Sequence, residues 1–214
     1  MNRENQIKAA QHLLSIKAVK LSPEEPFTWA SGRKSPIYCD NRLTLSYPNI
    51  RTFIKEQFVY LVKEIFENID VIAGVATGGI AQGVLVAQEL NKPYVYVRAE
   101  AKDHGRKNQI EGEIHAGHTV VVIEDLVSTG KSSLLAVDAL RNAGCDVKGM
   151  AAIFTYELEV AKKNFEEKQV LLKTITNYST LIETAIQENY VSEENLISLK
   201  QWRENPEKWS DDRM

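Results

Sequence analysis

The sequence predicts an α/β protein with a central, mostly parallel sheet flanked by helices. Short apolar runs without alternation, such as residues 120–123, are typical of strands buried on both faces of a sheet. Helical stretches separate these runs, and strands that alternate with helices favour parallel pairing. The chain has 214 residues, of which 43% are hydrophobic, so it is long enough for one such domain with a sizeable core.

The predicted elements follow in order along the chain. Residues 4–16 and 49–67 carry apolar positions at helical spacing. Between these two helices, three prolines and a glycine over residues 20–42 indicate an irregular segment. The remaining elements are a strand at 71–73, a helix at 80–90, strands at 94–97 and 120–123, a helix at 134–142, a strand at 147–154, a helix from 158 to about 168, a strand at 170–175 and polar helices to the end.

We expect all of this to form a single domain, residues 1–214. A small N-terminal hood would span about residues 1–45 and the core about 46–157. A C-terminal strand and helices would occupy residues 158–214.

Net charge, the N-terminal sequence and cysteine spacing argue against several classes of function. The net charge of −3 gives no reason to expect a nucleic-acid partner. The N-terminus has neither a signal-peptide core nor a membrane-length apolar run, so we expect a soluble cytoplasmic protein without a membrane partner. Cys39 and Cys145 lie far apart without metal-ligand spacing, and we expect both to be reduced thiols.

The segment that follows residues 120–123 is the strongest functional motif. Glu124 and Asp125 come at the C-terminal end of the predicted strand, where open α/β sheets bind ligands. Residues 128–133 then place four hydroxyls around Gly130 at the start of a helix, whose N–H groups can hold a phosphate. Adjacent carboxylates suit a donor of hydrogen bonds, and a pair of sugar hydroxyls fits best. The segment therefore predicts a site for ribose 5-phosphate.

Two other interpretations of this segment compete. The tail of a P-loop would need a glycine five residues before Gly130, but Asp125 stands there. A purely structural strand–turn–helix unit, in which an acid or a serine caps the helix, would explain one acid more readily than the adjacent pair.

Residues 120–133 resemble the phosphoribosyl-diphosphate signature of the type I phosphoribosyltransferases. The resemblance implies that family's fold, with the N-terminal hood over a mostly parallel sheet. It implies that Glu124 and Asp125 are catalytic and hold the 2′- and 3′-hydroxyls of the ribose. The contacts to phosphoribosyl diphosphate that it implies are this acid pair together with Leu126, Val127, Ser128, Thr129, Gly130, Lys131 and Ser132.

A long polar loop, residues 98–118, begins where the strand at 94–97 ends. About twenty residues without apolar periodicity are typical of a lid or a disordered tip. Its cations could converge on a diphosphate, or form a solvated charge run balanced by the loop's acids. Spacing alone favours neither interpretation.

The start of this loop resembles the mobile catalytic loop of orotate phosphoribosyltransferases. By position, the resemblance implies that Arg98, Lys102 and His104 bind the diphosphate, with Lys102 and His104 counted as catalytic. It also implies a homodimer in which these residues act in the neighbouring subunit's site. One departure is Ala99, where many members of the family have lysine.

Two further segments concern the substrates. The glycine-rich turn at residues 73–79 could cradle the diphosphate, although tight packing also needs glycine, and one branch of the family has lysine in place of Gly78.

Residues 26–42 alone indicate a hairpin with a structural role, but their SGRKSP and YCDNR stretches resemble the hood of orotate phosphoribosyltransferases. Ala30 and Tyr156 stand where some members have lysine and arginine, so orotate recognition would rest on backbone, Ser128 and, as a further candidate, Arg42.

The activity implied is transfer of the phosphoribosyl group of 5-phospho-α-D-ribose 1-diphosphate to orotate, giving orotidine 5′-phosphate and diphosphate in de novo pyrimidine biosynthesis. Mg²⁺ would arrive on diphosphate oxygens, with no dedicated protein ligands. Two alternatives remain open. A purine or xanthine phosphoribosyltransferase should lack the hood motif, and a non-catalytic nucleotide-binding regulator should show a basic face.

Overall fold

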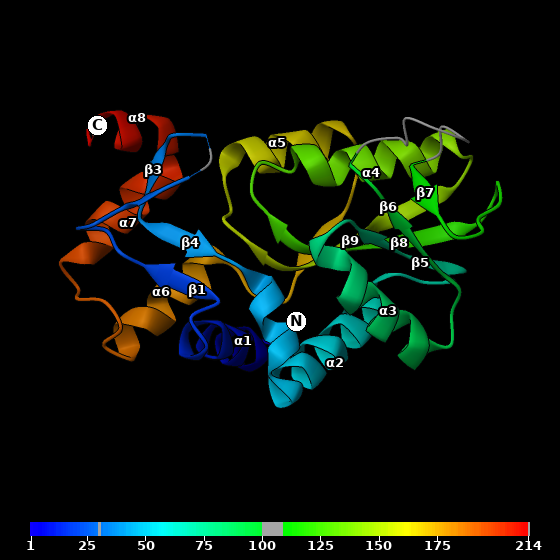
Figure 1. The fold of residues 1–214 in the computed structure, drawn as a ribbon, viewed down its shortest axis with the longest axis horizontal. Coiled ribbons are helices and arrows are strands. Elements are labelled where there is room, and N and C mark those ends of the chain that lie inside the picture. Colours follow the sequence, from blue (N-terminus) through cyan, green and yellow to red (C-terminus); the bar gives the residue numbers. More distant parts are fainter. Residues whose placement is uncertain (30, 100–108, 214) are drawn as a thin grey trace.

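A twisted six-stranded sheet forms the centre of the molecule in the computed structural model, which describes residues 1–29, 31–99 and 109–213 (Figure 1). The strand order is β10-β9-β8-β5-β6-β7. Neighbouring strands are parallel except β7, which runs antiparallel to β6. The strands are β5 (Val71–Val75), β6 (Tyr94–Val97), β7 (Ile110–Glu111), β8 (Thr119–Val127), β9 (Asp146–Thr155) and β10 (Leu172–Thr174).

Helices cover both faces of this sheet. On one face lie α1 (Arg3–Ser15), α2 (Pro48–Ile65) and α3 (Gly78–Leu90), which share a core with Ile72, Val121 and Ile153 of the sheet. The other face is covered by α4 (Lys131–Asn142) and α5 (Glu159–Glu167), which pack on the alternate strand residues such as Val122 and Ala152. Because both faces are covered, the central strands are apolar throughout rather than alternating.

The N-terminal hood is built from two short antiparallel strand pairs. β1 (Val19–Leu21) pairs with β4 (Ile37–Cys39), and β2 (Phe27–Thr28) pairs with β3 (Lys34–Ser35). A 3-10 helix, η1 (Asn41–Ser46), then leads into α2.

The C-terminal helices are α6 (Tyr178–Gln187), α7 (Asn195–Glu204) and α8 (Pro206–Asp211). The hood hairpin β2–β3 lies against α8, far along the chain (Figure 1). The Lys34 N–H donates to Ser210 Oγ at 2.9 Å, and Arg33 pairs with Glu207 at 2.6 Å. The tail therefore supports the hood.

The structure confirms the predicted α/β class and corrects the sequence interpretation at two places. The predicted strand at 120–123 is longer, because β9 pairs with β8 as far as Val127, so the acid pair lies within the strand rather than after it. In the predicted loop at 98–118, Ile110 and Glu111 return to the sheet as β7, since Ile110 is buried against its other face.

Trp202 joins the tail to the hood through aromatic contacts. Its ring is 1% exposed and lies 5.2 to 5.9 Å from the rings of Trp29, Tyr156 and Tyr178. Trp202, like Trp209, is a buried packing residue of the tail.

We predict that Trp202→Ala lowers the free energy of unfolding by about 3–5 kcal/mol, because it leaves a large cavity in a well-packed cluster. The matched control is Ile197→Ala on the same helix, where the side chain is 67% exposed and the expected change is within about 0.5 kcal/mol. Urea unfolding followed by circular dichroism measures both, and equal effects would show that the cluster does not stabilise the tail.

Candidate active site

A cavity of about 280 Å³ opens at the C-terminal ends of β5 and β8. Two strand-to-helix turns form its walls, one leading into α3 and the other into α4. This is the edge of a parallel sheet where helix N-termini present free N–H groups to a ligand. The residues that line the cavity are Val75, Ala76, Thr77, Gly78, Glu124, Asp125, Leu126, Ser128, Thr129, Gly130 and Ser132.

The turn after β8 is shaped to receive an anion. Gly130 has a φ of +78°, and a Cβ there would lie 2.6 Å from the ring of Phe165, so both conformation and space favour glycine. α4 begins immediately afterwards, and its first-turn N–H groups have no acceptor within the helix. Hydroxyls of Ser128, Thr129 and Ser132 stand beside them. The arrangement suits a phosphate.

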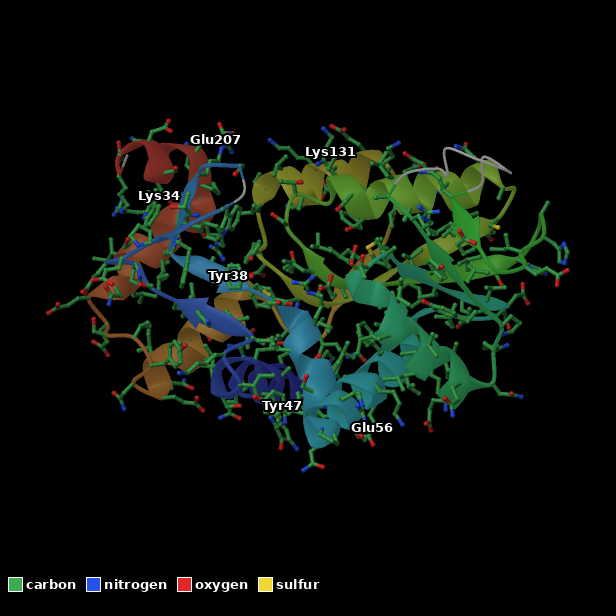
Figure 2. All side chains as sticks on the ribbon, in the orientation of Figure 1. Lys34, Tyr38, Tyr47, Glu56, Lys131 and Glu207 are labelled. Carbon is green, nitrogen blue, oxygen red and sulfur yellow. The ribbon has the colours of Figure 1, made fainter. Side chains whose placement is uncertain are left out.

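Two residues predicted to contact the substrate do not line the described cavity. Val127 is fully buried in the core, so it could contribute only backbone atoms. The side chain of Lys131 is exposed on α4 (Figure 2).

Glu124 is the buried member of the acid pair, with 5% of its surface exposed. Its Oε2 accepts from Ser133 Oγ and its Oε1 accepts from the Asp125 N–H, both at 2.9 Å. Burial, and then the neighbouring charge of Asp125, raise the pKa of the Glu124 carboxyl well above its ordinary value. Ser133 lies just beyond the segment that the sequence pattern singles out, and only the fold shows that it faces this acid.

Asp125 is the accessible member of the pair. Its carboxyl group lies over Gly78, where a Cβ would come within 2.2 Å of Asp125 Cγ. A side chain at position 78 would therefore compete with this carboxyl for space. On the main chain, the Asp125 carbonyl accepts from Asn41 Nδ2 of the hood at 2.7 Å.

The glycine-rich turn after β5 also has a packing requirement. A Cβ on Gly79 would lie 2.3 Å from the carbonyl oxygen of Ile123, so α3 can approach β8 this closely only with glycine there. The Ala76–Thr77 peptide bond is cis, and both residues line the cavity. The packing and ligand interpretations of this turn are therefore compatible.

Comparison with known proteins places the chain in a family. The phosphoribosyl transferase domain profile matches residues 45–189. The orotate phosphoribosyltransferase of Listeria monocytogenes is 56% identical over 209 residues, which are 98% of this chain and 99% of that protein. That of Bacteroides fragilis is 54% identical over 200 residues, 94% of each chain. This chain belongs to the orotate phosphoribosyltransferases.

Solved structures agree with this family assignment. The crystal structure of orotate phosphoribosyltransferase from Aeropyrum pernix matches with a TM-score of 0.74 and 28% identity, covering 86% of this chain and 99% of that one. Leishmania donovani UMP synthase matches with a TM-score of 0.78 and 26% identity over 92% of this chain, which spans 42% of that longer protein. The fold is the type I phosphoribosyltransferase fold.

Residues 100–108 of the predicted loop at 98–118 lie outside the residues that the structure describes. Lys102 and His104 are among them. The described Arg98 donates its N–H to the Gln109 carbonyl at 2.8 Å, and its guanidinium lies 3.6 Å from Glu111. In this arrangement Arg98 does not line the described cavity.

Arg42 and Tyr156, at two positions considered for recognition of the base, are both engaged within the protein. Arg42 is held by Asp40 through bonds of 2.7 and 2.9 Å, and it lines neither described cavity beside Ser128. Tyr156 is buried and stacks on Trp29 with ring centroids 5.7 Å apart. Aromatic packing therefore occupies the position of Tyr156.

A second cavity of about 400 Å³ lies between the hood hairpin, the turn after β8 and the C-terminal helices. Ser128 and Thr129 line both this cavity and the acid-pair cavity, so the two adjoin. Trp29 and Trp202 contribute aromatic surface to it, and Arg33 and Lys34 contribute charge.

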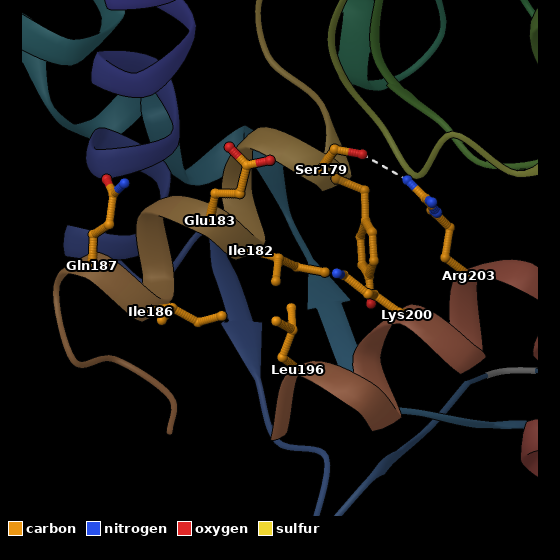
Figure 3. Close-up of a pocket in the computed structure, with 9 residues that line it drawn as sticks. Ser179, Ile182, Glu183, Ile186, Gln187, Leu196, Lys200 and Arg203 are labelled. Atoms are coloured by element: carbon orange, nitrogen blue, oxygen red, sulfur yellow. Dashed lines mark hydrogen bonds between the residues drawn. The ribbon is translucent and has the colours of Figure 1, made fainter. Parts of the chain in front are cut away.

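A third cavity, of about 320 Å³, lies between α6 and α7 (Figure 3). Ile182, Ile186 and Leu196 line it with apolar surface, and at its edge Arg203 donates to Ser179 Oγ at 2.6 Å. It contains none of the predicted site residues.

Within the described residues, no group of three or more histidine, cysteine, aspartate or glutamate side chains could hold a metal ion. None of the helices described is long and apolar enough to span a bilayer.

The raised pKa of Glu124 predicts a stability effect with a definite sign. The pKa of glutamate in an unfolded chain is about 4.3. Because the pKa of Glu124 is higher in the folded protein, the folded protein loses stability as pH rises between these two pKa values. Glu124→Gln cannot ionise. We therefore expect its melting temperature, relative to wild type, to be higher at about pH 8 than at about pH 5.

The matched control for this measurement is Glu56→Gln, an exposed acid on α2 (Figure 2). Its effect on the melting temperature should be small and should change little between the two pH values. A Glu124→Gln effect that is equal at both would contradict the proposed cost of ionising the buried acid.

Proposed function

We propose that this chain transfers the phosphoribosyl group of 5-phospho-α-D-ribose 1-diphosphate to orotate, giving orotidine 5′-phosphate and diphosphate. Membership in the family supports this reaction. The observation that carries the proposal for this chain is a single cavity in which an acid pair adjoins an anion-binding turn. A ribose 5-phosphate needs both of these features within one cavity.

In the proposed mechanism, the turn at residues 128–132 holds the 5′-phosphate. The C1–O bond to diphosphate breaks and the bond from C1 to orotate N1 forms, with inversion at C1, and the departing diphosphate takes the N1 proton. Positive charge develops on the ribose ring as diphosphate leaves, so catalysis rests on positioning and electrostatics. Neither acid needs to act as a nucleophile.

The two acids have unequal parts in this proposal. Asp125 lines the cavity with its carboxyl accessible, so it accepts the hydrogen bonds of the ribose hydroxyls and stabilises the developing charge. Glu124 is already engaged with Ser133 and the Asp125 N–H. Glu124 therefore contributes to the position of its neighbour, and each of its oxygens keeps a lone pair for a ribose hydroxyl.

We place the diphosphate beside the turn that leads into α3, where Thr77 and Gly78 line the cavity at the N-terminus of that helix. Arg98, Lys102 and His104 would neutralise it. Mg²⁺ would supply further charge neutralisation on the diphosphate oxygens. In the described part of the cavity, the acid pair supplies the carboxyl oxygens that could contact Mg²⁺. Two such groups fit an ion that takes most of its ligands from water and substrate.

Large exposed apolar side chains support a homodimer. They come from β4, η1, α2 and α3 and from the residue that joins η1 to α2. Of these elements, η1, α2 and α3 pack against one another. Such side chains are typical of a surface that a partner covers. They are Tyr38, Leu43, Tyr47, Tyr60 and Val84 (Figure 2 labels Tyr38 and Tyr47).

The substrate is tested by ultraviolet loss of orotate in the presence of phosphoribosyl diphosphate and Mg²⁺. Adenine, hypoxanthine, xanthine and uracil are assayed in parallel. We expect turnover of orotate alone. Consumption of a purine with orotate inert would show that the base assignment is wrong, while leaving the phosphoribosyltransferase fold intact.

Sharing of the site across a dimer is tested by mixing two inactive variants. Asp125→Asn and Lys102→Ala homodimers should each be nearly inactive, because every site lacks one group. If Lys102 comes from the partner, both defects in a hybrid dimer can fall in one site and leave the other complete. Random reassortment of equal amounts should then restore about a quarter of wild-type activity.

Subunit exchange is verified by native mass spectrometry, with separately incubated homodimers as the control. If Lys102 acted within its own chain, every site would keep one defect. No recovery after verified exchange would therefore contradict the shared site.

A further inference from the structure

Asn41 connects the hood to the acid pair. It is the first residue of η1, and its side chain is 1% exposed. Its Nδ2 donates to the Asp125 carbonyl at 2.7 Å, and its Oδ1 accepts from the Cys39 thiol at 3.3 Å. Both ends of the amide are therefore used, and only a side chain with a donor and an acceptor can make both contacts.

The part of β8 that Asn41 contacts lacks one sheet neighbour. β5 pairs with β8 only as far as Ile123, whereas β9 continues to Val127. Among the described strands, β9 alone flanks β8 here, and it pairs with Glu124 and Leu126 on either side of Asp125. The hydrogen bond from Asn41 therefore holds β8 at a point where β5 no longer pairs with it.

The other described contacts of Asp125 come from its own strand and from the turn into α3. Its N–H donates to Glu124 Oε1, and its carboxyl lies over Gly78. Among the described residues, the bond from Asn41 is the hydrogen bond that reaches the Asp125 main chain from the hood.

We infer that Asn41 is a positioning residue for the transfer reaction, which holds Asp125 where the ribose hydroxyls arrive and makes that position depend on the placement of the hood. The inference rests on the proposed function. A small displacement of a catalytic group can lower a rate by orders of magnitude, because charge stabilisation in the transition state depends on geometry. The effect should appear in kcat more than in the binding of phosphoribosyl diphosphate.

The first test compares Asn41→Ala with wild type. We expect kcat to fall about tenfold, equivalent to about 1.4 kcal/mol of transition-state stabilisation, while KM for phosphoribosyl diphosphate changes by less than about threefold. The matched control is Asn5→Ala, which removes another amide donor, the one that contacts Gln57 Oε1 at 2.9 Å. It should leave kcat within about twofold of wild type.

A double-mutant cycle separates positioning from a general structural role. In an Asp125→Asn background, the charge that Asn41 positions is gone, so Asn41→Ala should lower kcat by less than about twofold. A tenfold loss in both backgrounds would overturn the inference, because it would show that Asn41 acts independently of that carboxylate. Asn41→Leu, which is close to asparagine in shape and has no donor, takes the place of the alanine variant in the same cycle if the latter does not fold.

The activity of the wild-type protein distinguishes a failure of the proposed function from a failure of this inference. Absence of orotate turnover by wild type overturns the proposed function. An active wild type with an Asn41→Ala variant that retains kcat within about twofold overturns only the role of Asn41.

Discussion

The active-site cavity depends on β8 continuing along β9 after its other neighbour, β5, has turned away. The β5–β8 pairing ends at Ile123, and the β8–β9 pairing ends at Val127. β5 leads into the glycine-rich turn at this point, so the space beside the last residues of β8 is open. The acid pair therefore stands on a hydrogen-bonded strand at the wall of a cavity, which holds it more rigidly than a loop would.

The same constraint gives the two acids different environments and different roles. Side chains of successive strand residues point to opposite sides, so the two acids have different neighbours although both line the cavity. Glu124 is buried under the N-terminal turn of α4, where Ser133 meets it, and Asp125 lines the cavity over Gly78. Burying a carboxyl costs stability, and such a cost is more readily tolerated at functional sites than elsewhere.

Sequence reasoning could predict the fold class and the acid-pair cavity because both have local signals. Apolar runs alternating with amphipathic helices indicate the sheet, and Gly130 among hydroxyls indicates the anion-binding turn. The contacts that refine the site have no such signal. Asn41 meets Asp125 across 84 residues, and Trp29 meets Tyr156 across a still larger separation. These pairs are set by how the hood packs on the core, which periodicity does not describe.

The most direct test of the account measures how the acid pair recognises ribose hydroxyls. Ribose 5-phosphate and 2-deoxyribose 5-phosphate are titrated calorimetrically into wild type and into Asp125→Asn. The account predicts that wild type binds the ribose compound more tightly by about tenfold, since a charge-assisted hydrogen bond is lost with the hydroxyl, and that the variant discriminates much less. Equal affinity of wild type for both compounds would contradict the assignment of the acid pair to the sugar.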